Sequence, residues 1–211
     1  MAGNSGPRNL AGKTLWLVIF FAGLIWSAIN PKDITTWWLE VLPALIGAVI
    51  MAWTRRSFPL TGLLYTLILV HMLVLMVGGH YTYAEVPLFD DLKSIFGFER
   101  NNYDKVGHFA QGFVPAVIAR ELLIRNRVVN GRFWLSFLVV SVCLAISALY
   151  ELIEWGVAVT SEQASEAFLG TQGYVWDTQS DMAFALIGAC LAVLGLSRWH
   201  DRQIAELRVA P

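Results

Sequence analysis

Six long apolar stretches constrain this 211-residue chain more than any other feature. Most approach the ~20 residues that an α-helix needs to cross the ~30 Å hydrocarbon core of a bilayer, and the first two are a little short. The composition agrees, because 56% of the residues are hydrophobic and only 15% are charged, against about 25% charged in a typical soluble domain. We therefore predict an all-α, polytopic membrane helical bundle that forms a single transmembrane domain over residues 1–211. The six transmembrane helices are expected at about residues 15–29, 37–53, 60–78, 106–124, 133–157 and 178–199.

The distribution of basic residues predicts how these spans are oriented. All but four of the 15 lysines and arginines flank the spans on one side, and the exceptions are Lys32, Lys93, Arg100 and Lys105. Cytoplasmic loops carry an excess of basic residues, so both termini are expected in the cytoplasm. The nine tryptophans fall at or near expected span ends, where an indole ring is favoured. Two longer loops, at about 79–105 and 158–177, are then outside, and the role of the first stays open.

Seven acidic and histidine side chains fall at the outer ends of four spans. A bilayer penalises ionisable groups by roughly 2.5–3.5 kcal/mol each at mid-depth on insertion scales, so a chain that keeps so many at one face is expected to use them. Six of them form three pairs spaced three or four residues apart, and such pairs share a helix face. We expect these faces to meet in one pocket. The seven residues are His80, Asp104, His108, Glu151, Glu154, Asp177 and Asp181.

We assign roles to these residues from their expected depth in the membrane and from their charge. Catalytic roles fall to the residues expected about a turn inside the bilayer boundary, which are His108, Glu151, Glu154 and Asp181. Substrate-binding roles fall to His80, Arg100, Asp104, Lys105, Gln172 and Asp177.

Two chemistries fit this cluster. In a metal-free site, His108 is the base and a desolvated Glu154 is the acid. In a metal site, zinc, manganese or a di-iron pair binds imidazole and carboxylate ligands. The spans contain neither H-E-x-x-H nor Glu-x-x-His, so the sequence leaves the cofactor unknown, with a divalent metal as one option. The candidate ligands are His80, His108, Glu151, Glu154 and Asp181.

Several of these residues also have ordinary explanations. Asp104 and Asp177 fit solvated residues at helix N-termini, and His80 fits an interfacial loop histidine. Glu162 and Glu166 fit an exposed loop face.

Four further residues lie outside the cluster. His71, deeper in the third span, is either a packed histidine or a partner of the cluster, and His200, after the last span, is expected to be solvated. Cys143 and Cys190 are expected to be buried structural thiols, because both lie inside apolar stretches.

Four segments carry a family resemblance. They are residues 79–87 (GHYTYAEVP), 100–109 (RNNYDKVGHF), 150–155 (YELIEW) and 170–182 (GTQGYVWDTQSDM). Together they resemble the YjdF family of bacterial inner-membrane proteins, whose function is unknown, over about residues 25–191. The resemblance implies a multi-pass protein of the bacterial inner membrane and no established activity.

A weaker likeness is to the VanZ-type membrane proteins, which are associated with glycopeptide-antibiotic resistance. Those proteins pair an Asp-Lys-x-x-His-Phe helix start with a later Glu and with an Asp that begins the final span. Residues 104–109 (DKVGHF), then Glu151 or Glu154, then Asp177 or Asp181 are the matching positions. The chain lacks the usual Asn four residues after that Asp, so the register is ambiguous. The likeness implies cell-envelope chemistry.

Three functions are compatible with these features. The first is an envelope enzyme that acts on a lipid or lipid-linked headgroup at the outer leaflet. The second is a non-catalytic binder or small transporter of a cation or amphiphile, which is disfavoured because the spans are polar mainly near their outer ends. The third is a structural or assembly factor. The lipid bilayer is the expected partner, no basic patch suits nucleic acid, and the oligomeric state stays open.

Overall fold

The chain folds into helices only, over the residues that the computed structural model describes, 7–160 and 171–209. All six expected spans coincide with a helix, which confirms the all-α prediction for these residues, and a short additional helix, α4, lies in the expected outer loop. The helices are α1 (Pro7–Ala28), α2 (Ile34–Thr54), α3 (Gly62–Tyr81), α4 (Pro87–Phe96), α5 (Tyr103–Arg125), α6 (Arg132–Thr160) and α8 (Asp177–Val209).

Five of the described helices are long and apolar enough to cross a membrane: α1, α2, α3, α6 and α8. The chain is therefore a multi-pass membrane protein. Helix α5 has the length of a span, with 23 residues, but its polar side chains leave it outside that group. Among them are Gln111, Arg120 and Glu121.

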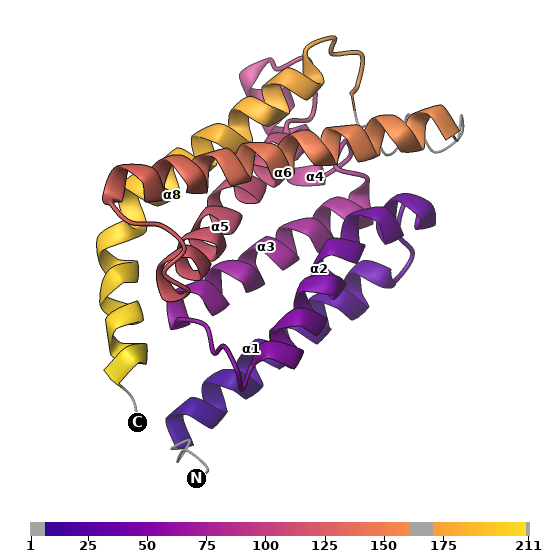
Figure 1. Cartoon of the computed structure of the whole chain (residues 1–211). Helices are drawn as coiled ribbons and strands as arrows, with labels where there is room; N and C mark the ends of the chain where they lie inside the picture. Colours follow the sequence, from indigo (N-terminus) through magenta and orange to yellow (C-terminus); the bar gives the residue numbers. More distant parts are fainter. Residues whose placement is uncertain (1–6, 161–170, 210–211) are drawn as a thin grey trace.

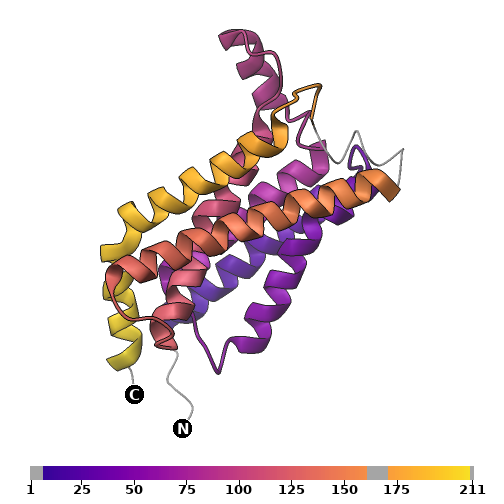
Figure 2. The same cartoon turned by 45° about the horizontal axis from the view of Figure 1, so that its top comes forward.

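The long helices form a bundle with α5 at its centre (Figure 1). Helix α5 contacts α3, α6 and α8, whereas α1 and α2 both pack on α3. The two termini lie at one end of the bundle, and α4 projects from the opposite end (Figure 2). We call these the terminal end and the α4 end.

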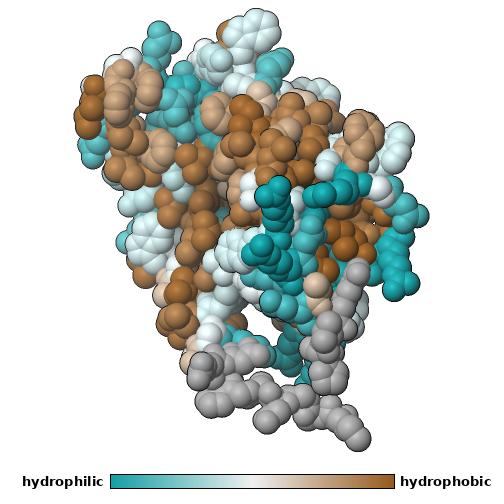
Figure 3. Space-filling view, turned by 90° about the vertical axis from the view of Figure 1, so that its left-hand side faces the viewer, coloured by the Kyte–Doolittle hydropathy of each residue, from teal (hydrophilic) through white to brown (hydrophobic). Residues whose placement is uncertain are grey.

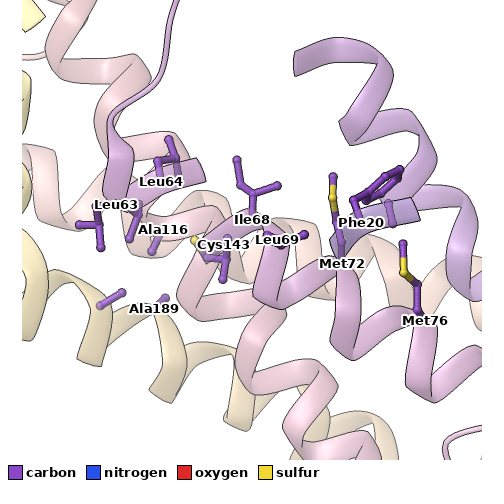
Figure 4. Close-up of a cluster of buried hydrophobic side chains, with 14 of the residues drawn as sticks. Phe20, Leu63, Leu64, Ile68, Leu69, Met72, Met76, Ala116, Cys143 and Ala189 are labelled. Carbon is purple, nitrogen blue, oxygen red and sulfur yellow. The ribbon is translucent and has the colours of Figure 1, made fainter. Parts of the chain in front are cut away.

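The apolar core lies between α3 and its neighbours (Figure 4). Leu64 and Met76 of α3 are fully buried, as is Cys143 of α6, which agrees with its expected role as a structural thiol. Cys190 is half-buried. Many large apolar side chains point outward instead, such as Trp53, which is 84% exposed, and apolar residues cover broad areas of the surface (Figure 3). A bilayer accepts such a surface, because its hydrocarbon is as apolar as these side chains.

Helices α5 and α8 pack backbone to backbone. A Cβ atom on Gly112 would overlap the backbone of Ala185, and one on Gly188 would overlap the carbonyl of Phe109. Small residues allow membrane helices to approach this closely. The contact lies one helical turn from His108 on α5 and one turn from Asp181 on α8, so it brings those two side chains within reach of each other.

Candidate functional site

Five charged side chains form a buried network at the α4 end. Arg100 precedes α5, Asp104 and Lys105 lie in its first turn, and Asp177 and Asp181 open α8. The Lys105 Nζ atom lies 2.7 Å from Asp181 Oδ1, 2.9 Å from Asp177 Oδ1 and 3.3 Å from Asp104 Oδ2. Arg100 pairs with Asp104 and Asp177. All five are buried, so the explanation of Asp104 and Asp177 as solvated residues is wrong. We call this set the ion-pair network.

Tyr174 covers the two cations of the ion-pair network. Its ring centroid lies 5.4 Å from Arg100 Cζ and 5.6 Å from Lys105 Nζ, within the range of cation–π attraction. Removing one partner of a buried charge pair is strongly destabilising, because it leaves a charge without compensation. The network therefore ties the start of α5 to the start of α8.

Beside the network, a second group gathers around His108. Its Nε2 atom lies 3.8 Å from Asp181 Oδ1, and its Nδ1 atom lies 3.9 Å from Glu151 Oε1. The Nδ1 atom is also 3.2 Å from Gln111 Oε1. Glu154 is buried one turn along α6 and interacts electrostatically with Glu151. The structure thus brings the four expected catalytic residues into one region, which we call the acid–histidine cluster: His108, Glu151, Glu154 and Asp181.

Two polar atoms on the α6 face of this cluster have no hydrogen-bond partner among the described residues. They are Glu151 Oε1 and Ser147 Oγ, which lie one helical turn apart. Buried polar atoms are normally satisfied, and exceptions often mark a bound water, ion or ligand.

Glu40 of α2 extends the cluster and was not foreseen from the sequence. It is 5% exposed. The Tyr150 hydroxyl donates a hydrogen bond of 3.1 Å to its Oε2 atom, and the Tyr83 phenol lies close enough to interact with the carboxylate. Glu154 lies close enough to interact with it electrostatically. An acid inside an apolar span is itself a signal of function, and that signal could have found Glu40.

An unusual backbone conformation at Thr82 and Tyr83 directs the Tyr83 side chain toward Glu40. Thr82 and Tyr83 both have positive φ, +57° and +55°, which sends the Tyr83 ring back between α3 and α5. A Cβ atom on Gly78 or Gly107 would overlap the ring, so glycine is required on both sides. Burial raises the pKa of the Tyr83 phenol well above its usual range, and the charge of Glu40 raises it further. The phenol therefore stays protonated and can donate to Glu40.

A groove of about 740 Å³ adjoins the ion-pair network. Three of the expected substrate-binding residues line it, namely Arg100, Lys105 and Gln172, together with aromatic side chains that include Phe109 and Phe184. The acid–histidine cluster does not line the groove. Lys105 stands between the two, because it lines the groove and also bonds Asp181 of the cluster.

Gln172 has a structural bond as well. Its side chain accepts a hydrogen bond of 2.9 Å from the backbone N–H of Asn101 and donates one of 2.9 Å to the Asn101 carbonyl. The paired bonds hold the segment before α8 against the segment before α5, so Gln172 shapes the groove wall.

His80 lies apart from the cluster. Its ring stacks on Trp26 with centroids 4.6 Å apart, and its Nδ1 atom is 3.1 Å from the Ser27 carbonyl oxygen. Neither of the described metal-compatible groups includes it. The structure therefore does not bring His80 to the residues with which the sequence grouped it.

The terminal end has a buried polar cluster of its own. Glu121 is fully buried, with bonds to His200 Nε2 at 2.9 Å, Arg125 Nη1 at 2.8 Å and Thr61 Oγ1 at 2.8 Å. Arg120 Nη1 lies 3.2 Å from His200 Nδ1. His200 is 0% exposed, so the expectation that it is solvated is wrong.

His71, also named from the sequence, belongs to neither cluster. His71 of α3 is half-buried, and its Nε2 atom has no partner among the described residues. Glu162 and Glu166 lie outside the described residues, so their expected place on an exposed loop face stays a prediction.

Comparisons with known proteins agree with the fold. The family described as "Predicted membrane protein (DUF2238)" matches residues 12–202. The chain is also similar to "Inner membrane protein YjdF" of Escherichia coli (strain K12), with 50% identity over 196 residues, which cover 93% of this chain and 91% of that protein. No solved structure matches. These matches confirm the resemblance drawn from the four sequence segments.

Proposed function

The chain belongs to the DUF2238 family of predicted membrane proteins, and we propose that it is an envelope enzyme that acts on a lipid or lipid-linked headgroup at the outer leaflet. Its location is the bacterial inner membrane, as for its Escherichia coli relative. The observation that carries the proposal is the groove beside Lys105, which adjoins the buried acid–histidine cluster at the same end of the bundle.

The proposal includes six crossings, with α5 as the sixth span and both termini in the cytoplasm. Termini at one end of the bundle support an even number of crossings (Figure 1). Helix α5 contacts α3, α6 and α8, and its Arg120 and Glu121 side chains are buried. A central helix tolerates polar groups better than one in contact with lipid. The α4 end is then extracytoplasmic, at the depth of the lipid headgroups.

The groove suits a headgroup in size and in chemistry. Its volume of about 740 Å³ lies within the ~300–1,000 Å³ of typical ligand sites. Arg100 and Lys105 offer positive charge to a phosphate or another anion. Phe109 and Phe184 give the groove apolar walls, against which the start of an acyl or prenyl chain can pack.

The acid–histidine cluster offers acid–base chemistry next to the groove, from which Lys105 separates it. In a hydrolysis, His108 takes a proton from water as the water oxygen bonds to the headgroup atom under attack. Glu154 gives a proton to the oxygen that leaves. Glu151 and Asp181 flank the imidazole at 3.9 Å and 3.8 Å, where they stabilise the cation that forms. Such proton transfers typically contribute about 10²–10⁴-fold to a rate.

The test is complementation by conservative variants. In a strain that lacks this protein and has a scorable envelope phenotype, H108Q and E154Q should reach normal abundance in the membrane but fail to restore the phenotype. Purified wild-type protein in vesicles of inner-membrane lipids should convert a lipid species that mass spectrometry detects. We expect a loss of about 10²–10⁴-fold in H108Q.

Two control variants sharpen this test. H80Q changes the same residue type at the same end of the bundle, away from the cluster, and should complement fully. F184W fills part of the groove without touching the cluster and should lower conversion. Full complementation by H108Q and E154Q would contradict the proposed site.

The ion-pair network favours a second candidate, a structural or assembly factor. Its carboxylates and cations are paired with one another, as in a joint between helices. On this reading H108Q and E154Q disappear from the membrane together with function, and no lipid is converted.

A further inference from the structure

We propose that His108, Glu151 and Asp181 bind a divalent transition-metal ion, zinc or manganese. One nitrogen from His108 and one carboxylate oxygen from each acid all lie within 4.8 Å of one another. Imidazole and carboxylate are ligands that both metals accept. Zinc bonds of about 2.0–2.2 Å would draw the three side chains together by about 1 Å.

The Glu151 carboxylate gives evidence for a bound ion that is independent of the grouping of the three side chains. Its side chain is 7% exposed, and its Oε1 atom has no hydrogen-bond partner among the described residues. That atom lies 3.9 Å from His108 Nδ1. A buried carboxylate oxygen in this position has lost its hydrating water without any replacement. A bound cation compensates for that loss.

The distribution of charge distinguishes this group from the neighbouring aspartates. Asp104, Asp177 and Asp181 also lie close enough to share an ion, but Lys105 and Arg100 already supply the cations there. Within the acid–histidine cluster, Lys105 therefore bonds Asp181 directly, whereas Glu151 interacts with it only electrostatically.

The surroundings also hold the ligands in the orientation that a metal requires. The Nδ1 atom of His108 lies 3.2 Å from Gln111 Oε1, and its Nε2 atom lies 3.8 Å from Asp181 Oδ1. Asp181 in turn is held by Lys105 at 2.7 Å. Metal-binding histidines and carboxylates are usually fixed by such outer hydrogen bonds.

This inference deepens the proposed function and rests on it for the ion's role. With the ion bound, His108 would be a ligand and not the base. A zinc ion with three protein ligands would keep a position for water and lower the pKa of that water to about 7, so the ion would take over the activation of water that His108 performs in the metal-free site. Binding itself does not depend on that role. Retention of metal without lipid conversion would therefore overturn the proposed function alone.

The experiment is metal retention by the purified full-length protein in detergent. The protein is stripped with a chelator, reloaded with Zn²⁺ or Mn²⁺, desalted and analysed by mass spectrometry of the metal. Wild type should retain about one ion per chain with at least one of the two metals, and its thermal midpoint should rise on loading. H108Q and E151Q should each retain less than a tenth of that amount and show no rise.

H80Q is the matched control and should retain as much metal as wild type. If H108Q fails to accumulate, E151Q decides, because the change keeps the side-chain shape and removes no hydrogen bond from Oε1. The proposal is overturned if wild type retains neither metal, if E151Q retains as much as wild type, or if H80Q loses the ion as H108Q does.

Discussion

Individual side chains at the α4 end differ in how their charge is compensated. Lys32 and Glu85 form an ion pair of 2.7 Å with side chains more than half exposed, and pairs of this kind typically contribute about 0–1 kcal/mol. Asp104, in contrast, is 6% exposed and pairs with Arg100 and Lys105. A carboxylate therefore contributes very differently to stability in these two settings.

The substitution D104N should destabilise the protein strongly. It leaves two buried cations with one carboxylate fewer, and breaking a buried pair in this way costs on the order of 3–5 kcal/mol. Thermal unfolding in detergent, followed by tryptophan fluorescence, measures the loss. E85Q makes the same chemical change in the exposed pair and should have little effect, because solvent screens that pair. Equal small losses in the two variants would show that the ion-pair network does not stabilise the fold.

At this scale the sequence predicted the convergence of His108, Glu151, Glu154 and Asp181, because helical spacing and common depth determine it. It did not predict Glu40, whose partners Tyr83 and Tyr150 come from other elements. Nor did it predict the burial of His200, since that depends on α8 continuing beyond the expected span and on packing against Glu121. Pairing across helices depends on rotation and register, which periodicity does not encode.

At the scale of whole elements, the contact between α5 and α8 positions the cluster. The backbone of Ala185 occupies the space that a side chain on Gly112 would need, and a backbone cannot rotate away as a flexible side chain can. Apolar stretches predicted all six long helices, but α4 was missed. It has only ten residues, too few to produce a hydrophobic stretch of the length by which the other helices were found.

The substitution G112A should push α5 and α8 apart. Overpacking typically costs about 1–3 kcal/mol, and the shift should also disturb the contact between His108 and Asp181. Thermal unfolding measures the first effect, and complementation the second. G195A on α8 is the control, because a Cβ atom there meets nothing within 4 Å. It should be neutral or stabilise by up to ~1 kcal/mol. A neutral G112A would contradict the close approach.

For the molecule as a whole, the sixth crossing depends on α5, the most polar of the long helices. Ser94 on α4 and Asn130 after α5 are both exposed and lie on either side of it. In a background with both cysteines replaced by alanine, S94C should react with an impermeant maleimide in intact cells. N130C should react only after permeabilisation. Labelling of both from outside would show that α5 does not cross.

The position of the Tyr83 ring between Gly78 and Gly107 has a consequence for biogenesis. The ribosome delivers α3 first, then the loop with Tyr83, and α5 afterwards. The ring can therefore settle against α3 while its other side is still open. Once α3 and α5 are packed together, the ring could not enter between their backbones without separating the two helices. Vectorial synthesis thus matches the order in which this joint closes, and a circular permutant starting at α5 would have to assemble it in reverse.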